Sequence, residues 1–382
     1  MDELFTESFG LTEDLADNNK TQTPEEALVA ELSKKGYQCL KDERLEDAKD
    51  AFGEILTHEE TNNYALVGMG DALRKMGHFK EAIDYYKKCL EFHEGNNYAL
   101  FGMADCYKAM RQYKTALAIW ERYLENDNQN ITVLTRIADA FRKTKEFDKS
   151  KKVYQKVLAM EDNNPYALIG LGHLHYDFKE YREALRYWKK IFDLHGEDVD
   201  IRVLTSMGNC YRKLRQFEDG VFFFGKALEK DEDNFYALFG MADCYRGMNN
   251  NLKSLEYWLK ILEQDPHNKV ILTRAGDSYR HLGDFDKASE YYNKALNIEF
   301  DTYAVLGLAI IAKSQKKYDE AISSLRRLIQ QDPRDYHYCI ELADCLLKKG
   351  DKNGALEELV RFSRFGNRNA QIATLIEKLQ GQ

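Results

Sequence analysis

Proline is scarce in this sequence, and long apolar runs are missing. The 382 residues include only 4 prolines, and because proline interrupts helices, long stretches are free to be helical. No stretch reaches the length of about eighteen apolar residues that a membrane helix needs, and the opening residues lack the basic start and apolar segment of a secretory signal. With 44% hydrophobic and 31% charged residues, we expect a folded helical protein without a membrane span.

Catalytic and metal-binding motifs are also missing. The 7 cysteines contain no CxxC pair, which fits reduced thiols and a cytoplasmic location better than a zinc or disulfide framework. A phosphate-binding loop, a nucleophile elbow and an HExxH motif are lacking. His173 and His175 are two residues apart, so on a helix they point to different faces and we expect a packed or surface role. No enzyme activity, cofactor or metal is predicted.

What the sequence does contain is one pattern repeated along almost its whole length. A small residue recurs at intervals of about 34 residues, at Ala48, Ala82, Ala116, Ser150, Ala184, Gly220, Ser254, Ala288, Ala321 and Ala355. Twelve residues before each stands a glycine or alanine, and four residues after each stands a large side chain. Small residues facing large ones at fixed offsets are what two closely packed antiparallel helices require. Each repeat is therefore predicted to be a helical hairpin.

The pattern resembles the tetratricopeptide repeat family, whose unit is a helix-turn-helix of about 34 residues. The resemblance implies an all-α, right-handed superhelical solenoid of ten antiparallel helix pairs. The predicted repeats are 29–62, 63–96, 97–130, 131–164, 165–200, 201–234, 235–268, 269–301, 302–335 and 336–369. Two extra residues fall near His195 to Asp200. Residues 1–28 are predicted to be an acidic N-terminal segment, and 370–382 a capping helix and tail with one apolar face.

Family resemblance further implies that the first helices line a concave groove. The residues expected there are at places 2, 5, 6, 9, 12 and 13 of each repeat, which we call the groove places. Two kinds of repeat alternate along them, and residues 98–106 recur unchanged at 236–244. Duplication explains this alternation, and so does a set of contacts repeated along an extended ligand. Tyrosines at place 2, with a glycine at place 6 opening space beside them, suggest ligand contact, while packing between hairpins explains them equally well.

Acidic residues at place 9 are often followed three residues later by a basic residue. Each pair is explained by an ion pair on a solvated helix face. The groove places nevertheless carry twice as many basic as acidic side chains, although the formal net charge of the chain is −9, which predicts a basic groove that attracts an acidic guest. The candidate contact residues are Tyr98, Phe101, Asp105, Lys108, Arg136, Asp139, Arg142, Tyr166, His173, Arg212, Tyr236, Phe239, Asp243, Arg246, Arg274, Asp277 and Arg280.

The function predicted from these features is that of a non-catalytic scaffold or adaptor, which binds an extended acidic segment of a protein. A substrate-recruiting subunit of a separate enzyme is the second interpretation, and binding of single-stranded nucleic acid is the third. The interspersed aspartates and the net charge of −9 weigh against nucleic acid. Residues 1–23 are acidic and contain apolar side chains, so we also consider that this segment docks in the groove.

Overall fold

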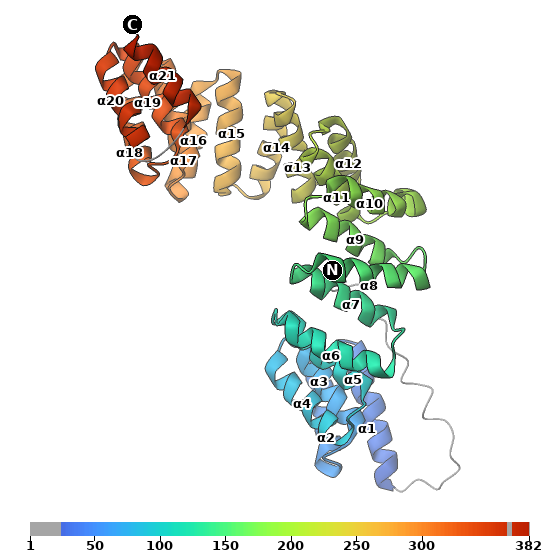
Figure 1. Ribbon diagram of the computed structural model, residues 1–382. Coiled ribbons are helices and arrows are strands. Elements are labelled where there is room, and N and C mark those ends of the chain that lie inside the picture. Colours follow the sequence, from blue (N-terminus) through green and yellow to red (C-terminus); the bar gives the residue numbers. More distant parts are fainter. Residues whose placement is uncertain (1–23, 365–368, 382) are drawn as a thin grey trace. The chain divides into compact units, whose positions relative to one another are not determined.

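The computed structural model describes residues 24–364 and 369–381. Within them the chain forms 21 α-helices, one short 3-10 helix and no strand. They group into two compact units divided between Leu174 and His175, and each unit is a stack of antiparallel helix pairs (Figure 1). The all-α helical-repeat solenoid is thus confirmed, and its right-handed course stays a prediction. No helix in the described ranges is both long and apolar enough to cross a bilayer.

Helix positions follow the repeat closely. The helices of the N-terminal unit are α1 (Pro24–Lys41), α2 (Leu45–His58), α3 (Asn63–Lys75), α4 (Phe79–Phe92), α5 (Asn97–Ala109), α6 (Tyr113–Asn126), α7 (Ile131–Lys143) and α8 (Phe147–Met160). The division between the units falls within α9 (Pro165–Asp177). The C-terminal unit continues with α10 (Tyr181–His195), η1 (Gly196–Asp198), α11 (Ile201–Lys213), α12 (Phe217–Lys230), α13 (Phe235–Gly247), α14 (Asn251–Gln264), α15 (Lys269–Leu282), α16 (Phe285–Ile298), α17 (Thr302–Ser314), α18 (Tyr318–Gln331), α19 (Tyr336–Lys349), α20 (Lys352–Arg364) and α21 (Ala370–Gln380).

Predicted repeat starts can be compared directly with these bounds. Nine of the ten predicted repeats begin at the first residue of a helix, whereas α1 begins at Pro24, ahead of the predicted Val29. The two extra residues fall in and around η1. At the C-terminal end, Ile372 of α21 is buried, and other apolar side chains of this helix pack against the same core. This helix therefore covers apolar surface of the final hairpin.

Local chemistry at both ends of the first helices fixes the hairpins. The residue before the helix caps it, as when the Asn96 side chain accepts a hydrogen bond of 2.9 Å from the backbone of Ala99, an arrangement worth about 1 kcal/mol. Place 15, in the turn between the two helices, has a positive φ in every repeat, at Glu43, Gly77, Arg111, Lys145, Lys179, Arg215, Asn249, Gly283, Lys316 and Gly350. Most of these residues are not glycine, so the positive φ cannot be predicted from residue type.

The core of each hairpin is the large side chain at place 24. Phe52, Tyr86, Trp120, Phe224 and Tyr292 have no exposed surface. The small residue at place 8 of the same repeat makes room for the ring, as predicted: a Cβ atom added to Gly208 would lie 2.8 Å from the Phe224 ring. Replacing this glycine with any other residue would therefore require the ring to shift.

A second glycine, at place 6 of the following repeat, receives the same ring from the other side. A Cβ atom on Gly102 would lie 2.4 Å from the Tyr86 ring, and one on Gly240 would lie 2.2 Å from that of Phe224. The space beside place 2 is therefore filled by the preceding hairpin, and our interpretation that these glycines open room for a ligand is wrong.

The same contact follows the alternation of the two kinds of repeat. Place 6 is glycine after each phenylalanine or tyrosine hairpin, at Gly68, Gly102, Gly170, Gly240 and Gly307. After each tryptophan hairpin it is a larger residue, namely Arg136, Ser206 or Arg274. At the five glycine junctions the ring and the receiving residue are thus complementary, so packing between hairpins contributes to the alternation.

Three glycines offer a graded test of this packing. We expect Gly240→Ala to lower the free energy of unfolding by about 2 kcal/mol, because the new methyl group overlaps the Phe224 ring. Gly283→Ala should cost about 1 kcal/mol, since its φ is 85° and nothing lies within 4 Å of the added atom. Gly225→Ala, in α12 with open space around it, should be neutral or slightly stabilising. Urea unfolding midpoints measure all three, and equal midpoints for Gly240→Ala and Gly225→Ala would contradict the packing account.

Candidate functional site

Several of the predicted charge pairs make contacts within their own hairpin. A role in ligand binding is therefore not needed to explain them. The Tyr86 hydroxyl donates a 2.8 Å hydrogen bond to Oδ1 of Asp71, and Arg74 donates to the same carboxylate at 2.9 Å and to the Tyr86 oxygen at 3.3 Å. Burial, together with the nearby Asp71 carboxylate, raises the pKa of Tyr86, so its hydroxyl stays a donor. Place 9, place 12 and place 24 thus form one polar cluster.

The Tyr292 hairpin has the same arrangement, and the Tyr154 hairpin has the same arginine–aspartate pair beside its buried ring. Tyr292 donates to Asp277 at 2.8 Å and accepts from Arg280 at 3.2 Å, and the Arg280–Asp277 ion pair measures 3.6 Å. Arg142 contacts Asp139 at 2.6 Å with only 6% of its side chain exposed, close to the buried Tyr154. Four predicted contact residues, Asp139, Arg142, Asp277 and Arg280, therefore serve the fold of their own hairpins, whatever else they contact.

In the N-terminal unit, Asp105 and Arg136 form a closed pair. Nη1 of Arg136 lies 3.0 Å from Oδ1 of Asp105, with 13% and 11% of the side chains exposed. The guanidinium also lies 4.9 Å from the centre of the Phe101 ring, a cation–π contact. Because Asp105 pairs with the next repeat, the predicted pairing with Lys108 is not the one formed. Lys108 itself is half-buried.

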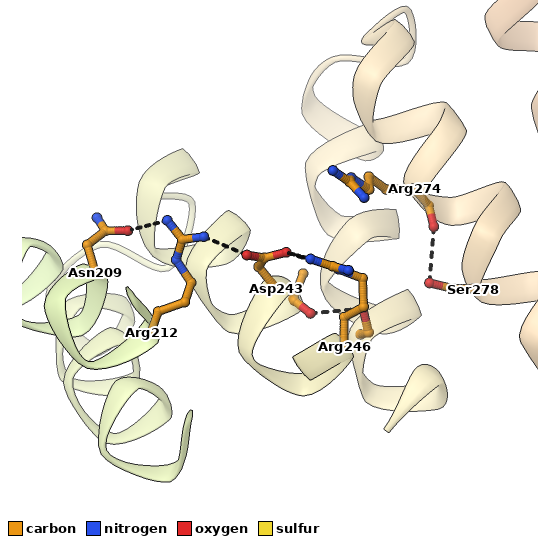
Figure 2. Close-up of polar contacts among 8 residues, drawn as sticks. Asn209, Arg212, Asp243, Arg246, Arg274 and Ser278 are labelled. Carbon is orange, nitrogen blue, oxygen red and sulfur yellow. Dashed lines mark hydrogen bonds and ion pairs between the residues drawn. The ribbon is translucent and has the colours of Figure 1, made fainter. Parts of the chain in front are cut away.

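In the C-terminal unit, the corresponding aspartate has different partners (Figure 2). Asp243 receives Nη1 of Arg212 at 2.5 Å and Nη2 of Arg246 at 2.6 Å. Arg212 also donates to the side chain of Asn209 at 3.0 Å. Burial by itself would raise the pKa of Asp243, but the hydrogen bonds and charges of Arg246 and Arg212 outweigh it and lower the pKa, so the carboxylate is ionised at neutral pH.

Arg274 lies on α15, at the place that Arg136 has in the N-terminal unit. Figure 2 shows it extending from α15 without a contact to Asp243. Its backbone oxygen accepts from Ser278 at 3.1 Å, and its half-buried guanidinium has no carboxylate partner among the residues that the structure describes. Arg246, which pairs with Asp243, nevertheless leaves 44% of its side chain exposed (Figure 2).

Exposed aromatic side chains accompany these charges. In the C-terminal unit, Tyr236 is 70% exposed and Tyr303 nearly as much, while Phe239 is half-buried with its ring 5.1 Å from that of Trp258. In the N-terminal unit, Tyr98 and Tyr166 are about half as exposed as Tyr236. The place-2 tyrosines of the C-terminal unit therefore offer the larger free aromatic surface.

All 7 cysteines are buried, and so is His175, one of the two histidines singled out in the sequence. His175 is buried and makes a 2.6 Å contact with Glu180, and His173 is half-buried. Burial raises the pKa of Cys106, Cys210 and Cys244 to about 12, which keeps these thiols protonated and unreactive. In the described ranges, no three His, Cys, Asp or Glu side chains are placed to hold a metal ion.

The predicted contact residues therefore divide into two sets. Tyr98, Phe101, Asp105, Lys108, Arg136, Asp139, Arg142, Tyr166 and His173 lie in the N-terminal unit, and Arg212, Tyr236, Phe239, Asp243, Arg246, Arg274, Asp277 and Arg280 lie in the C-terminal unit. Sequence reasoning missed Phe224, which offers Arg212 no hydroxyl group, and Lys313, which pairs with Asp344 at 2.9 Å and also with Glu341. A comparison of places 9 and 24 across repeats could have found Phe224.

Comparisons with known proteins agree with this architecture. One family model described as tetratricopeptide repeat matches residues 73–139 and 312–379, and a second with the same description matches 131–164 and 271–302. A search of curated protein sequences finds no significant match.

Among solved structures, the chain is similar to MamA, with 23% identity, a TM-score of 0.40, and coverage of 42% of this chain and 94% of that one. It is similar to yeast Tom70, with 15% identity, a TM-score of 0.42, and coverage of 94% and 96%. It is also similar to YrrB, described as a TPR protein with an unusual peptide-binding site, with 20% identity, a TM-score of 0.43, and coverage of 49% and 95%. The two family models, together with the repeated helix pairs, show that the chain belongs to the tetratricopeptide repeat family.

Proposed function

We propose that this protein is a non-catalytic scaffold or adaptor that binds an extended acidic segment of a partner protein along the first helices of its repeats. Tetratricopeptide repeats support protein–protein interaction in general. The acidic character of the guest and a cytoplasmic site of action are parts of our proposal.

The observation that carries the proposal is the excess of positive charge around Asp243. Arg212 and Arg246 already neutralise this one carboxylate, and Arg274 stands on the next first helix without a described acidic partner. Uncompensated cations on the wall of a binding surface attract anionic ligands and speed their association. An acidic polypeptide supplies carboxylates at several points along its length, as this surface requires.

Aromatic exposure favours a polypeptide over a small anion. Among the described residues of the C-terminal unit, Tyr236 and Tyr303 are the most exposed of the large hydrophobic side chains, and both stand at place 2 of their first helices. Tyrosine combines a flat apolar surface with a hydrogen-bonding hydroxyl, which makes it frequent in protein interfaces. A guest with carboxylates and apolar side chains interspersed would use both features.

Isothermal titration with a twelve-residue glutamate-rich peptide carrying one phenylalanine tests the proposal. We expect the full chain to bind this acidic peptide and not a lysine-rich peptide of equal length. Arg246→Gln should weaken binding about tenfold, because it removes an exposed cation from the surface. Lys260→Glu changes the charge of an exposed side chain on the second helix α14 and serves as the control with unchanged affinity.

The same titration is repeated at increasing salt concentration and with single-stranded RNA in place of the peptide. The affinity should fall as salt rises, since screening weakens exposed charge pairs. Absence of acidic-peptide binding at low salt would contradict the proposed guest. Tight binding of single-stranded RNA together with failure of the peptide would favour nucleic acid instead.

The acidic N-terminal segment is a second part of the proposal. Residues 1–23 lie outside the described residues, and their sequence combines carboxylates with leucine and phenylalanine side chains, the chemistry that we propose for the guest. We propose that this segment competes with the partner for the same surface. A chain beginning at Pro24 should then bind the acidic peptide more tightly than the full chain, and equal affinity of the two would contradict the competition.

A further inference from the structure

Two nearly identical parts of the chain differ in whether a following arginine is paired with a carboxylate. Residues 98–106 and 236–244 are identical, and each segment is followed in the next repeat by an arginine at place 6. Arg136 in the first copy is paired with Asp105 and lies over Phe101. Arg274 in the second copy has neither contact with the matching Asp243 and Phe239. Identical segments thus present their following arginine in two different states.

The cause of the difference lies one repeat earlier. Before the first copy, Asp71 and the Tyr86 hydroxyl hold Arg74 within its own hairpin, which leaves Asp105 to pair with Arg136. Before the second copy, the corresponding residues are Asn209 and Phe224, which lack the charge and the hydroxyl. Arg212 is therefore released and reaches Asp243 in the next repeat at 2.5 Å.

A second difference, two residues after each copy, reinforces the effect. The first copy continues with Lys108, which makes no described pair with Asp105, whereas the second continues with Arg246, whose guanidinium donates to Asp243 at 2.6 Å and 3.0 Å. Asp243 thus has an arginine on each side, as Figure 2 shows. A carboxylate that already accepts from two guanidinium groups gains little from a third, so Arg274 is left for another anion.

We infer that Arg274 is a binding site for one carboxylate side chain of the guest, an aspartate or glutamate, with the exposed Arg246 on the preceding first helix as a supporting charge. This inference rests on the proposed function. It identifies Arg274 as the cation that binds a carboxylate of the acidic guest. Arg136 is excluded as an equivalent anchor because Asp105 already occupies it. The specificity of the chain for acidic segments then follows from the tyrosine-to-phenylalanine and aspartate-to-asparagine differences in the sixth repeat.

Matched substitutions at the two arginines test the inference in the full chain, with the acidic peptide of the preceding section as the probe. Arg274→Gln should lower the affinity about tenfold and leave the thermal midpoint unchanged, because it removes a cation without a described carboxylate partner. Arg136→Gln should leave the affinity unchanged and lower the thermal midpoint, because it strands the buried Asp105.

A double substitution closes the site without touching Arg274. Asn209→Asp with Phe224→Tyr recreates the cluster of the second repeat, so Arg212 should return to its own hairpin and Asp243 should become available to Arg274. We expect the affinity of this variant to fall to that of Arg274→Gln.

Wild-type affinity in the folded Arg274→Gln variant would overturn the inference and leave the proposed function standing. If the double variant fails to fold, the Arg274→Gln and Arg136→Gln comparison still decides. Absence of acidic-peptide binding by the wild-type chain would instead contradict the proposed function itself.

Discussion

The structure depends on one constraint, the fit of a large place-24 side chain against the small place-8 residue of its own repeat and, after each phenylalanine or tyrosine hairpin, against a glycine at place 6 of the next. Tyr86, for example, leaves no room for a Cβ atom on Gly70 of its own hairpin or on Gly102 of the next. The same ring therefore sets both the spacing within a hairpin and the spacing between hairpins. Burial of such a side chain contributes a few kcal/mol, about 1.5–3 by transfer data, and every repeat contains one.

The identity of the ring also determines where charges lie. A tyrosine at place 24 brings a hydroxyl that must be satisfied when buried, and the aspartate and arginine at places 9 and 12 satisfy it. A phenylalanine makes no such demand, so Arg212 is free to bridge to Asp243 in the next repeat. Packing and surface charge are thus linked, and core packing contributes to the alternation that resembles a ligand-binding pattern.

Much of the fold was predictable because its determinants are local and periodic. Small and large residues at fixed offsets revealed the hairpins, and nine predicted repeats start where helices start. The partners of the charged residues were less predictable. Asp105 has Lys108 three residues away and Arg136 in the next repeat, and it pairs with Arg136. Which pair forms depends on distances between helices that the sequence does not contain. The left-handed turn residues, such as Lys145 and Arg215, also escaped, because their side chains do not identify that conformation.

In the tyrosine hairpins, the place-24 hydroxyl and the place-9 carboxylate act together to hold the place-12 arginine. A double-mutant cycle with Tyr292→Phe and Asp277→Asn, measured by urea unfolding, tests it most directly. Because the two groups share a 2.8 Å hydrogen bond and one arginine, the account predicts a coupling free energy of about 1 kcal/mol. Additive effects of the two substitutions, within about 0.3 kcal/mol, would contradict it.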